Sequence, residues 1–157
     1  MGYAGNNGKS YKALSKILQC EGIKPQNGFN MQGMREWFKN NPEQAEYLTN
    51  QNDRYIYFRI MPADAIGPKG AFGVELISKR AIAIDNTIFG LGFPVWLETS
   101  NPKGAPINRL VMAQDTGAAI RGAVRADFFW GSGSEAENMA GKMKRPGKYY
   151  FLIPKEE

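Results

Sequence analysis

Two aspartates in the C-terminal third of the chain have types and spacing that could do chemistry. Asp115 lies in the sequence Gln-Asp-Thr-Gly, and Asp127 precedes Phe-Phe-Trp twelve positions later (127 − 115). A pair of carboxylates can cleave a glycosidic bond, one as acid and the other as nucleophile or base. The apolar neighbours of Asp127 would favour its protonated form by desolvation, which suits a general acid. Aspartates beside glycine are also common turn formers, so a purely structural role for both stays open.

The Asp-Thr-Gly triplet at 115–117 is also found in aspartic proteases, where two carboxylates share one proton. It occurs once in this chain, so a protease would need a second copy from a homodimer. A dimeric protease of the retroviral type would not need the helices expected in the first 50 residues. The protease is therefore the weaker hypothesis.

The residue inventory excludes several classes of catalytic site. The 157 residues include no histidine and a single cysteine, Cys20. Histidine-dependent triads, HExxH zinc sites, cysteine-cluster metal sites and an internal disulfide are thereby excluded. No apolar run approaches the roughly 20 residues of a membrane-spanning helix. If the protein is an enzyme, it must therefore work with carboxylates, lysines, hydroxyls or backbone groups.

The N-terminal sequence GYAGNNGKS is similar to a phosphate-binding loop without matching its spacing. The position five residues before Gly8 holds Tyr3, where the nucleotide-binding pattern requires glycine. No apolar strand precedes the sequence to aim its amides at a phosphate. We therefore expect no nucleotide as a partner.

The charge balance favours a polyanionic partner such as nucleic acid, anionic lipid or acidic glycan. The net charge is +5 and the isoelectric point is near 9.3. The densest basic stretch holds Lys142, Lys144, Arg145 and Lys148. A solvated helix C-terminus explains such a stretch equally simply, because cations are favoured there.

Helical periodicity dominates the first 50 residues. After a glycine- and asparagine-rich loop over 1–9, apolar residues recur at helical spacing from Ser10 to Gly22. Asn30 is expected to cap a second helix, and Pro42 to occupy the first position of a third. A late helix is expected from Ser134, because Ser134 and Glu137 have capping-box spacing.

Strand-like sequences follow Asp53. They are short, apolar and bounded by turn residues, at 54–60, 72–76, 80–84, 94–99, 108–114, 126–130 and 148–154. So many short strands in about 100 residues favour a small barrel or a compact sandwich over a wound parallel sheet. The fold class predicted from the pattern is β-rich α+β.

Long stretches of the chain resemble a known family. "AIAIDNTIFGLGFPVWL" at 81–97 and the sequence from Ala113 to Lys155 look like the three-aspartate, or 3D, domain. "YAGNNGKSYKALSKIL" and "MQGMREWF" resemble the matching part of the membrane-bound lytic transglycosylase A (MltA) family. The three aspartates of the motif fall at Asp85, Asp115 and Asp127.

The resemblance implies a fold and an activity. The family fold is a six-stranded double-psi β-barrel, expected here as one domain with a helical segment over 1–52 and a barrel region over 53–157. The implied reaction cleaves the MurNAc–GlcNAc β-1,4 bond of peptidoglycan and leaves a 1,6-anhydro end. The implied partner is a peptidoglycan glycan strand, with no nucleic acid, and the implied reaction needs neither a metal nor another cofactor. The implied location is the periplasm, at the outer membrane in full-length members.

The resemblance also assigns roles to residues. It makes Asp127 the catalytic acid and Asp115 and Asp85 supporting residues. Weaker candidates for substrate contact are Gln114, Gly117, Arg125 and Trp130. Trp130 could stack on a sugar ring, although a core position is the commoner fate of such a tryptophan.

The chain departs from the family pattern in two respects. Gly90-Leu91-Gly92-Phe93 replaces the family's Pro-Leu-Gly-Thr after the first aspartate, so any role of that threonine is missing. The family's upstream barrel segment, second domain and lipid anchor are expected to lie outside this sequence. An inactive, glycan-binding or folding-unit fragment is therefore the alternative to an active enzyme.

Overall fold

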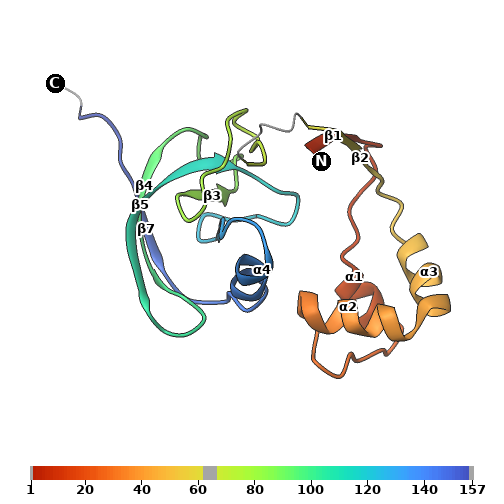
Figure 1. Cartoon of the computed structure of the whole chain (residues 1–157). Helices are drawn as coiled ribbons and strands as arrows, with labels where there is room; N and C mark the ends of the chain where they lie inside the picture. Colours follow the sequence, from red (N-terminus) through yellow and green to blue (C-terminus); the bar gives the residue numbers. More distant parts are fainter. Residues whose placement is uncertain (1, 62–66, 156–157) are drawn as a thin grey trace. The chain divides into compact units, whose positions relative to one another are not determined.

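The computed structural model describes residues 2–61 and 67–155, which form two compact units (Figure 1). The first unit is Met1–Pro62 and the second is Ala63–Glu157. Each has its own hydrophobic core. In the described ranges, no helix combines the length and apolar character that crossing a membrane requires.

The first unit contains a two-stranded sheet and three helices. Its elements are β1 (Gly2–Asn6), α1 (Leu14–Cys20), α2 (Met31–Asn40), α3 (Pro42–Asn50) and β2 (Ile56–Arg59). Ile17, Leu18 and Leu48 bury their side chains between the helices. The expected cap is confirmed, because the Asn30 side chain accepts a hydrogen bond from the Gly33 amide at 2.9 Å. Pro42 opens α3 as predicted.

The loop predicted over 1–9 is wrong in part. Residues 2–6 form strand β1, which pairs antiparallel with β2 from Gly2↔Arg59 to Asn6↔Ile56. A glycine- and asparagine-rich stretch has no periodicity of its own, and its partner lies some 50 positions away. The strand expected at 54–60 therefore pairs within the first unit and not in the barrel region.

The second unit is a curled five-stranded sheet with one helix (Figure 1). Its strands, in sheet order, are β6 (Ala126–Phe128), β3 (Ala81–Ile84), β5 (Pro106–Asp115), β4 (Pro94–Ser100) and β7 (Lys148–Phe151). The β3–β5 pair is parallel and the other pairs are antiparallel. Helix α4 (Ser134–Gly141) packs Ala136 and Met139 against the core.

The predicted β-rich α+β class is confirmed, whereas the six-stranded double-psi barrel is not. The strand predicted at 72–76 is wrong, because within it only Glu75 makes a bridge, to Lys69. A turn replaces it, in which the Gly73 amide donates to the Gly70 carbonyl at 2.9 Å. Alternating apolar residues matched a strand, but this local turn determines the conformation.

The capping box predicted at Ser134 and Glu137 is also wrong. Helix α4 already includes Ser134, so the cap position is Gly133, and no side-chain hydrogen bond caps it. Gly133 has φ of 90°, in the left-handed region that favours glycine. The chain therefore enters the helix through a glycine turn.

Candidate active site

Asp127 lies on the edge strand β6 and faces solvent. Half of its side chain is exposed (50%), so the apolar burial expected from Phe128-Phe129-Trp130 is wrong. Arg125 donates to both of its carboxylate oxygens, from Nε at 3.0 Å and from Nη2 at 3.2 Å. These hydrogen bonds raise the pKa of the Arg125 guanidinium. The carboxylate is thus accessible and is held by a two-point ion pair.

Asp115 lies on the same side of the sheet as Asp127. Both pair with Ala83 of the intervening strand β3, Asp127 antiparallel and Asp115 parallel. Directly paired residues project to one face, here the face opposite the buried Ile82 and Ile84. Two strand spacings separate the aspartate Cα atoms by roughly 10 Å. The residue between the two aspartates is thus the small, buried Ala83.

Asp115 also fixes the segment that precedes β3. Its Oδ1 accepts a hydrogen bond from the Ala71 amide at 2.9 Å. The neighbouring carbonyl of Gln114 accepts from the Phe72 amide at 3.1 Å. A Cβ on Gly70 would collide with that Gln114 carbonyl oxygen, so glycine permits the close approach. One carboxylate oxygen of Asp115 therefore has a structural role, because it holds this segment against the end of β5.

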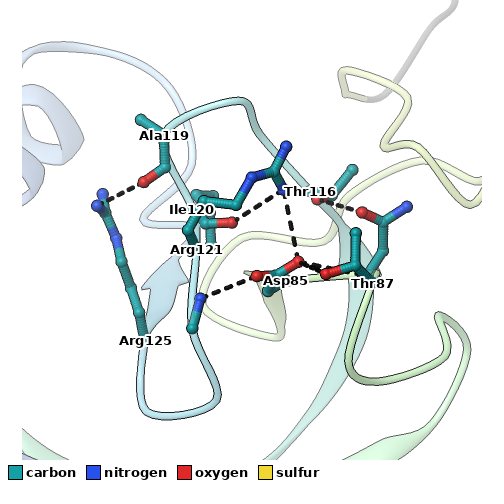
Figure 2. A network of polar contacts seen from close by, with 9 residues as sticks. Asp85, Thr87, Thr116, Ala119, Ile120, Arg121 and Arg125 are labelled. Carbon is teal, nitrogen blue, oxygen red and sulfur yellow. Dashed lines mark hydrogen bonds and ion pairs between the residues drawn. The ribbon is translucent and has the colours of Figure 1, made fainter.

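Asp85 is the buried member of the set, with 3% of its surface exposed at the end of β3. Its carboxylate joins two loops, as Figure 2 shows. From its own loop, Thr87 donates through the hydroxyl at 2.7 Å and the amide at 3.1 Å. From the loop 116–125, the Gly122 amide donates at 2.8 Å and the Arg121 guanidinium at 3.4 Å.

These donors determine the ionisation of Asp85. The Thr87 hydroxyl is the strongest influence, followed by the Gly122 and Thr87 amides, and together they lower the pKa of Asp85 from 3.8 to about 2. Burial acts in the opposite direction and is outweighed. Asp85 is therefore ionised near neutral pH, where its carboxylate holds two loops together and is unsuited to proton transfer.

Further contacts hold the loop 116–125, which connects β5 to β6. Thr116 donates to the Asn86 side chain at 3.1 Å, and Arg125 donates to the Ala119 carbonyl at 2.6 Å (Figure 2). The Tyr149 hydroxyl of β7 donates to the Ala123 carbonyl. Burial raises the pKa of Tyr149, so this donor keeps its proton. The loop between Asp115 and Asp127 is thus anchored at several points.

A cavity of about 540 Å³ lies beside Asp127. Its lining combines β6, the residues just before and after it, and the segment at the end of α4: Arg125, Ala126, Asp127, Phe128, Trp130, Ala140, Met143, Lys144 and Arg145. The volume is within the range of small-molecule sites. Its aromatic wall is an edge-to-face pair of Phe128 and Trp130, with ring centroids 5.0 Å apart. The site thus offers a carboxylate, cations and an aromatic wall in one hollow.

The structure separates the sequence-predicted residues into two groups. Arg125, Asp127 and Trp130 line the cavity. Trp130 does so from the core, with 8% of its surface exposed. Gln114 and Gly117 lie at the end of β5 and in the following turn, where Gly117 accepts from the Ile120 amide at 2.9 Å.

Sequence reasoning missed the partners of Asp85 and two of the three cations that line the cavity, Lys144 and Arg145. Thr87 could have been found, because Asp-x-Thr is the spacing of a side-chain-capped turn. Arg121 and Gly122 lie more than 30 positions from Asp85, and no local pattern links them. Lys144 and Arg145 were noticed only as part of a basic stretch. In the part of the chain that the structure describes, no group of three His, Cys, Asp or Glu side chains could hold a metal ion.

Two protein-family models match this chain, and together they cover most of it. Residues 80–153 match the 3D domain, and residues 1–59 match the MltA specific insert domain. The chain therefore belongs to the membrane-bound lytic transglycosylase A (MltA) family. The three aspartates and the loop that joins them all fall within the matched ranges.

Individual relatives agree with this assignment. Membrane-bound lytic murein transglycosylase A of Escherichia coli K12 is 31% identical over 157 residues, which are 96% of this chain and 42% of the relative. A crystal structure of MltA from Neisseria gonorrhoeae is 40% identical, with a TM-score of 0.84 over 98% of this chain and 39% of that one. Escherichia coli MltA with bound chitohexaose gives 0.80 at 28% identity, over 96% and 46%. The chain thus spans less than half of these relatives.

Proposed function

We propose that this chain carries the catalytic side of a lytic transglycosylase that cleaves the MurNAc–GlcNAc β-1,4 bond of peptidoglycan. The observation that carries the proposal is the accessible Asp127 carboxylate in a 540 Å³ cavity of a 3D domain. The related Escherichia coli protein binds chitohexaose, a β-linked sugar oligomer, in its crystal structure. We further propose that the protein acts in the cell envelope, in the periplasm, on glycan strands.

Asp127 acts first as acid and then as base in the proposed mechanism. Its carboxylic acid donates a proton to the glycosidic oxygen, and the bond from that oxygen to C1 of the muramoyl residue breaks. The muramoyl 6-hydroxyl oxygen forms a bond to C1 and gives its proton to the Asp127 carboxylate. The acid is regenerated and the product is a 1,6-anhydro ring. An internal nucleophile has a high effective molarity, so no activated water is needed.

The surrounding residues set the conditions for this step. Arg125 holds the Asp127 carboxylate in a two-point ion pair, so its guanidinium must give way to substrate before Asp127 acts as an acid. Asp115, across Ala83, is placed to stabilise positive charge that develops on the sugar ring. Asp85 holds the loop 116–125 and takes no part in proton transfer. The reaction requires no cofactor.

Digestion of purified murein tests the proposal, with mass spectrometry of the products. We expect 1,6-anhydromuramoyl ends, and reducing ends in their place would refute the transglycosylase mechanism. Turnover by Asp127→Asn at the wild-type rate would refute the role of Asp127. Asp53→Asn is the matched control, because Asp53 is an exposed, ion-paired aspartate of the first unit.

A second candidate function is glycan binding without turnover. The observation that favours it is the 42% of the Escherichia coli relative that this chain spans, because the activity belongs to the whole of such a protein. Binding of chitohexaose with no release of soluble products would support this candidate. Release of anhydro products by the 157 residues would exclude it.

A further inference from the structure

The cavity beside Asp127 carries more positive charge than its own aspartate compensates. Three cations and one carboxylate line it, namely Arg125, Lys144, Arg145 and Asp127. The two-point pair between Arg125 and Asp127 uses one charge of each sign. Lys144 and Arg145 remain, and no carboxylate lines the cavity beside them. Two cations therefore face a hollow with no internal counter-charge.

The positions of these cations distinguish them from an ordinary helix end. Helix α4 ends at Gly141, and Lys142 follows as its C-cap. The favourable effect of a helix C-terminus on cations falls off within its last turn. Lys144 and Arg145 lie three and four residues beyond Gly141, in the extended segment that leads to β7. Lys144 and Arg145 therefore belong to the wall of the cavity and not to the end of the helix.

Arg145 is held in place by the protein. Its Nη2 donates a hydrogen bond to the Pro102 carbonyl at 2.7 Å, in the turn between β4 and β5. A guanidinium has five N–H donors, so one such bond leaves most of them for a ligand. Arginine fixed in this way is suited to two-point recognition of a carboxylate. Lys144 adds a second, exposed ammonium beside it.

We propose that Lys144 and Arg145 are specificity-determining residues that bind a carboxylate carried on the muramoyl residue of the substrate. This inference rests on the proposed function, because it concerns the same cavity. Every muramoyl residue carries a lactyl ether, whose carboxyl group is either free or joined to a peptide that itself bears carboxylates. A neutral chitin-type oligomer has no such group. The two cations therefore discriminate peptidoglycan from neutral N-acetylglucosamine polymers.

Calorimetric titration of the 157-residue protein with matched sugars tests the proposal without turnover. The probes are the GlcNAc–MurNAc disaccharide, the same disaccharide with its lactyl carboxyl blocked as a methyl amide, a disaccharide–peptide, and chitobiose. We expect the free acid to bind about tenfold more tightly than the amide or chitobiose, since charge-assisted hydrogen bonds are the strong ones. The peptide-bearing probe shows whether the lactyl or the peptide carboxylate is recognised.

Substitutions test whether Lys144 and Arg145 cause the preference for the free carboxylate. Lys144→Met combined with Arg145→Met should abolish the preference while chitobiose binding stays unchanged. Lys142→Met is the matched control. It removes a positive charge only two positions from Lys144, but Lys142 does not line the cavity. Raised salt should weaken the preference in wild type and leave chitobiose binding unaffected.

The outcomes separate this inference from the proposed function. Equal affinity for acid, amide and chitobiose, a preference that survives the double variant, or binding of no probe would each overturn it. Melting curves of the variants show whether they are folded. Absence of anhydro products with the preference intact would instead refute the lyase activity and leave the carboxylate site standing.

Discussion

Asp85 and Asp127 lie on neighbouring strands of one sheet, and their surroundings are opposite. Asp85 is 3% exposed and accepts hydrogen bonds from two amides, a hydroxyl and a guanidinium. Asp127 is half exposed, and an equally exposed arginine is its partner. A carboxylate surrounded by protein donors has no capacity left for substrate. One motif thus contains both a buried carboxylate that holds two loops together and an exposed carboxylate, to which the proposed function assigns the reaction.

Asp115 is intermediate between these extremes. One of its oxygens accepts the Ala71 amide, and its side chain is half-buried beside Ala83. The exposure of the carboxylates therefore rises from Asp85 through Asp115 to Asp127. It predicts that substitutions at Asp85 act mainly on stability and those at Asp127 mainly on rate.

The largest effect is expected for Asp127→Asn. Loss of the acid should lower the rate of anhydro-product release by about 10²–10⁴-fold, the usual contribution of general acid–base catalysis. The melting temperature should barely change, because an exposed ion pair contributes about 0–1 kcal/mol. Murein digestion and circular dichroism melts give the two quantities. A large loss of stability would contradict the contrast with Asp85.

The next effect is a loss of stability in Asp85→Asn. The amide has one acceptor oxygen in place of two and adds donors that face other donors, so the backbone amides of Thr87 and Gly122 lose partners. We expect the melting temperature to fall by several degrees, with the rate reduced because the loop 116–125 loosens. Asp53→Asn, with an exposed carboxylate, serves as control. An unchanged melting temperature would show that the network is dispensable.

Much of this architecture could be predicted from the sequence, because local patterns determine it. Short apolar runs bounded by turn residues located β3 and β5, and so placed Asp85 and Asp115 at strand ends. The capping role of Asn30 follows from its side chain alone. Strand β1 escaped prediction because its partner is distant and its glycines show no period. The exposure of Asp127 could not be predicted for a similar reason. Whether a strand lies at the edge of a sheet depends on long-range strand pairing, which the local sequence does not show.

The pH dependence of stability separates Asp85 from exposed aspartates. Its pKa of about 2 in the folded state lies below the ordinary 3.8, so its stabilising contribution is complete above about pH 4. That contribution is lost as the pH falls through the folded value. The stability difference between wild type and Asp85→Asn should therefore shrink between about pH 4 and pH 2. Urea unfolding at each pH measures this stability difference. A constant difference would mean that ionised Asp85 does not stabilise the fold.

The smallest effect is expected for Arg125→Met, and Arg121→Met is its natural comparison. Both arginines belong to the loop 116–125, but Arg125 pairs with the exposed Asp127 and Arg121 with the buried Asp85. Arg125→Met removes a solvent-screened pair and should lower the free energy of unfolding by at most about 1 kcal/mol. Arg121→Met withdraws a cation from a carboxylate whose side chain is only 4% exposed, so it should cost more. Urea unfolding of both variants at pH 7 gives the order, and an equal or reversed order would mean that exposure does not set the strength of these two pairs.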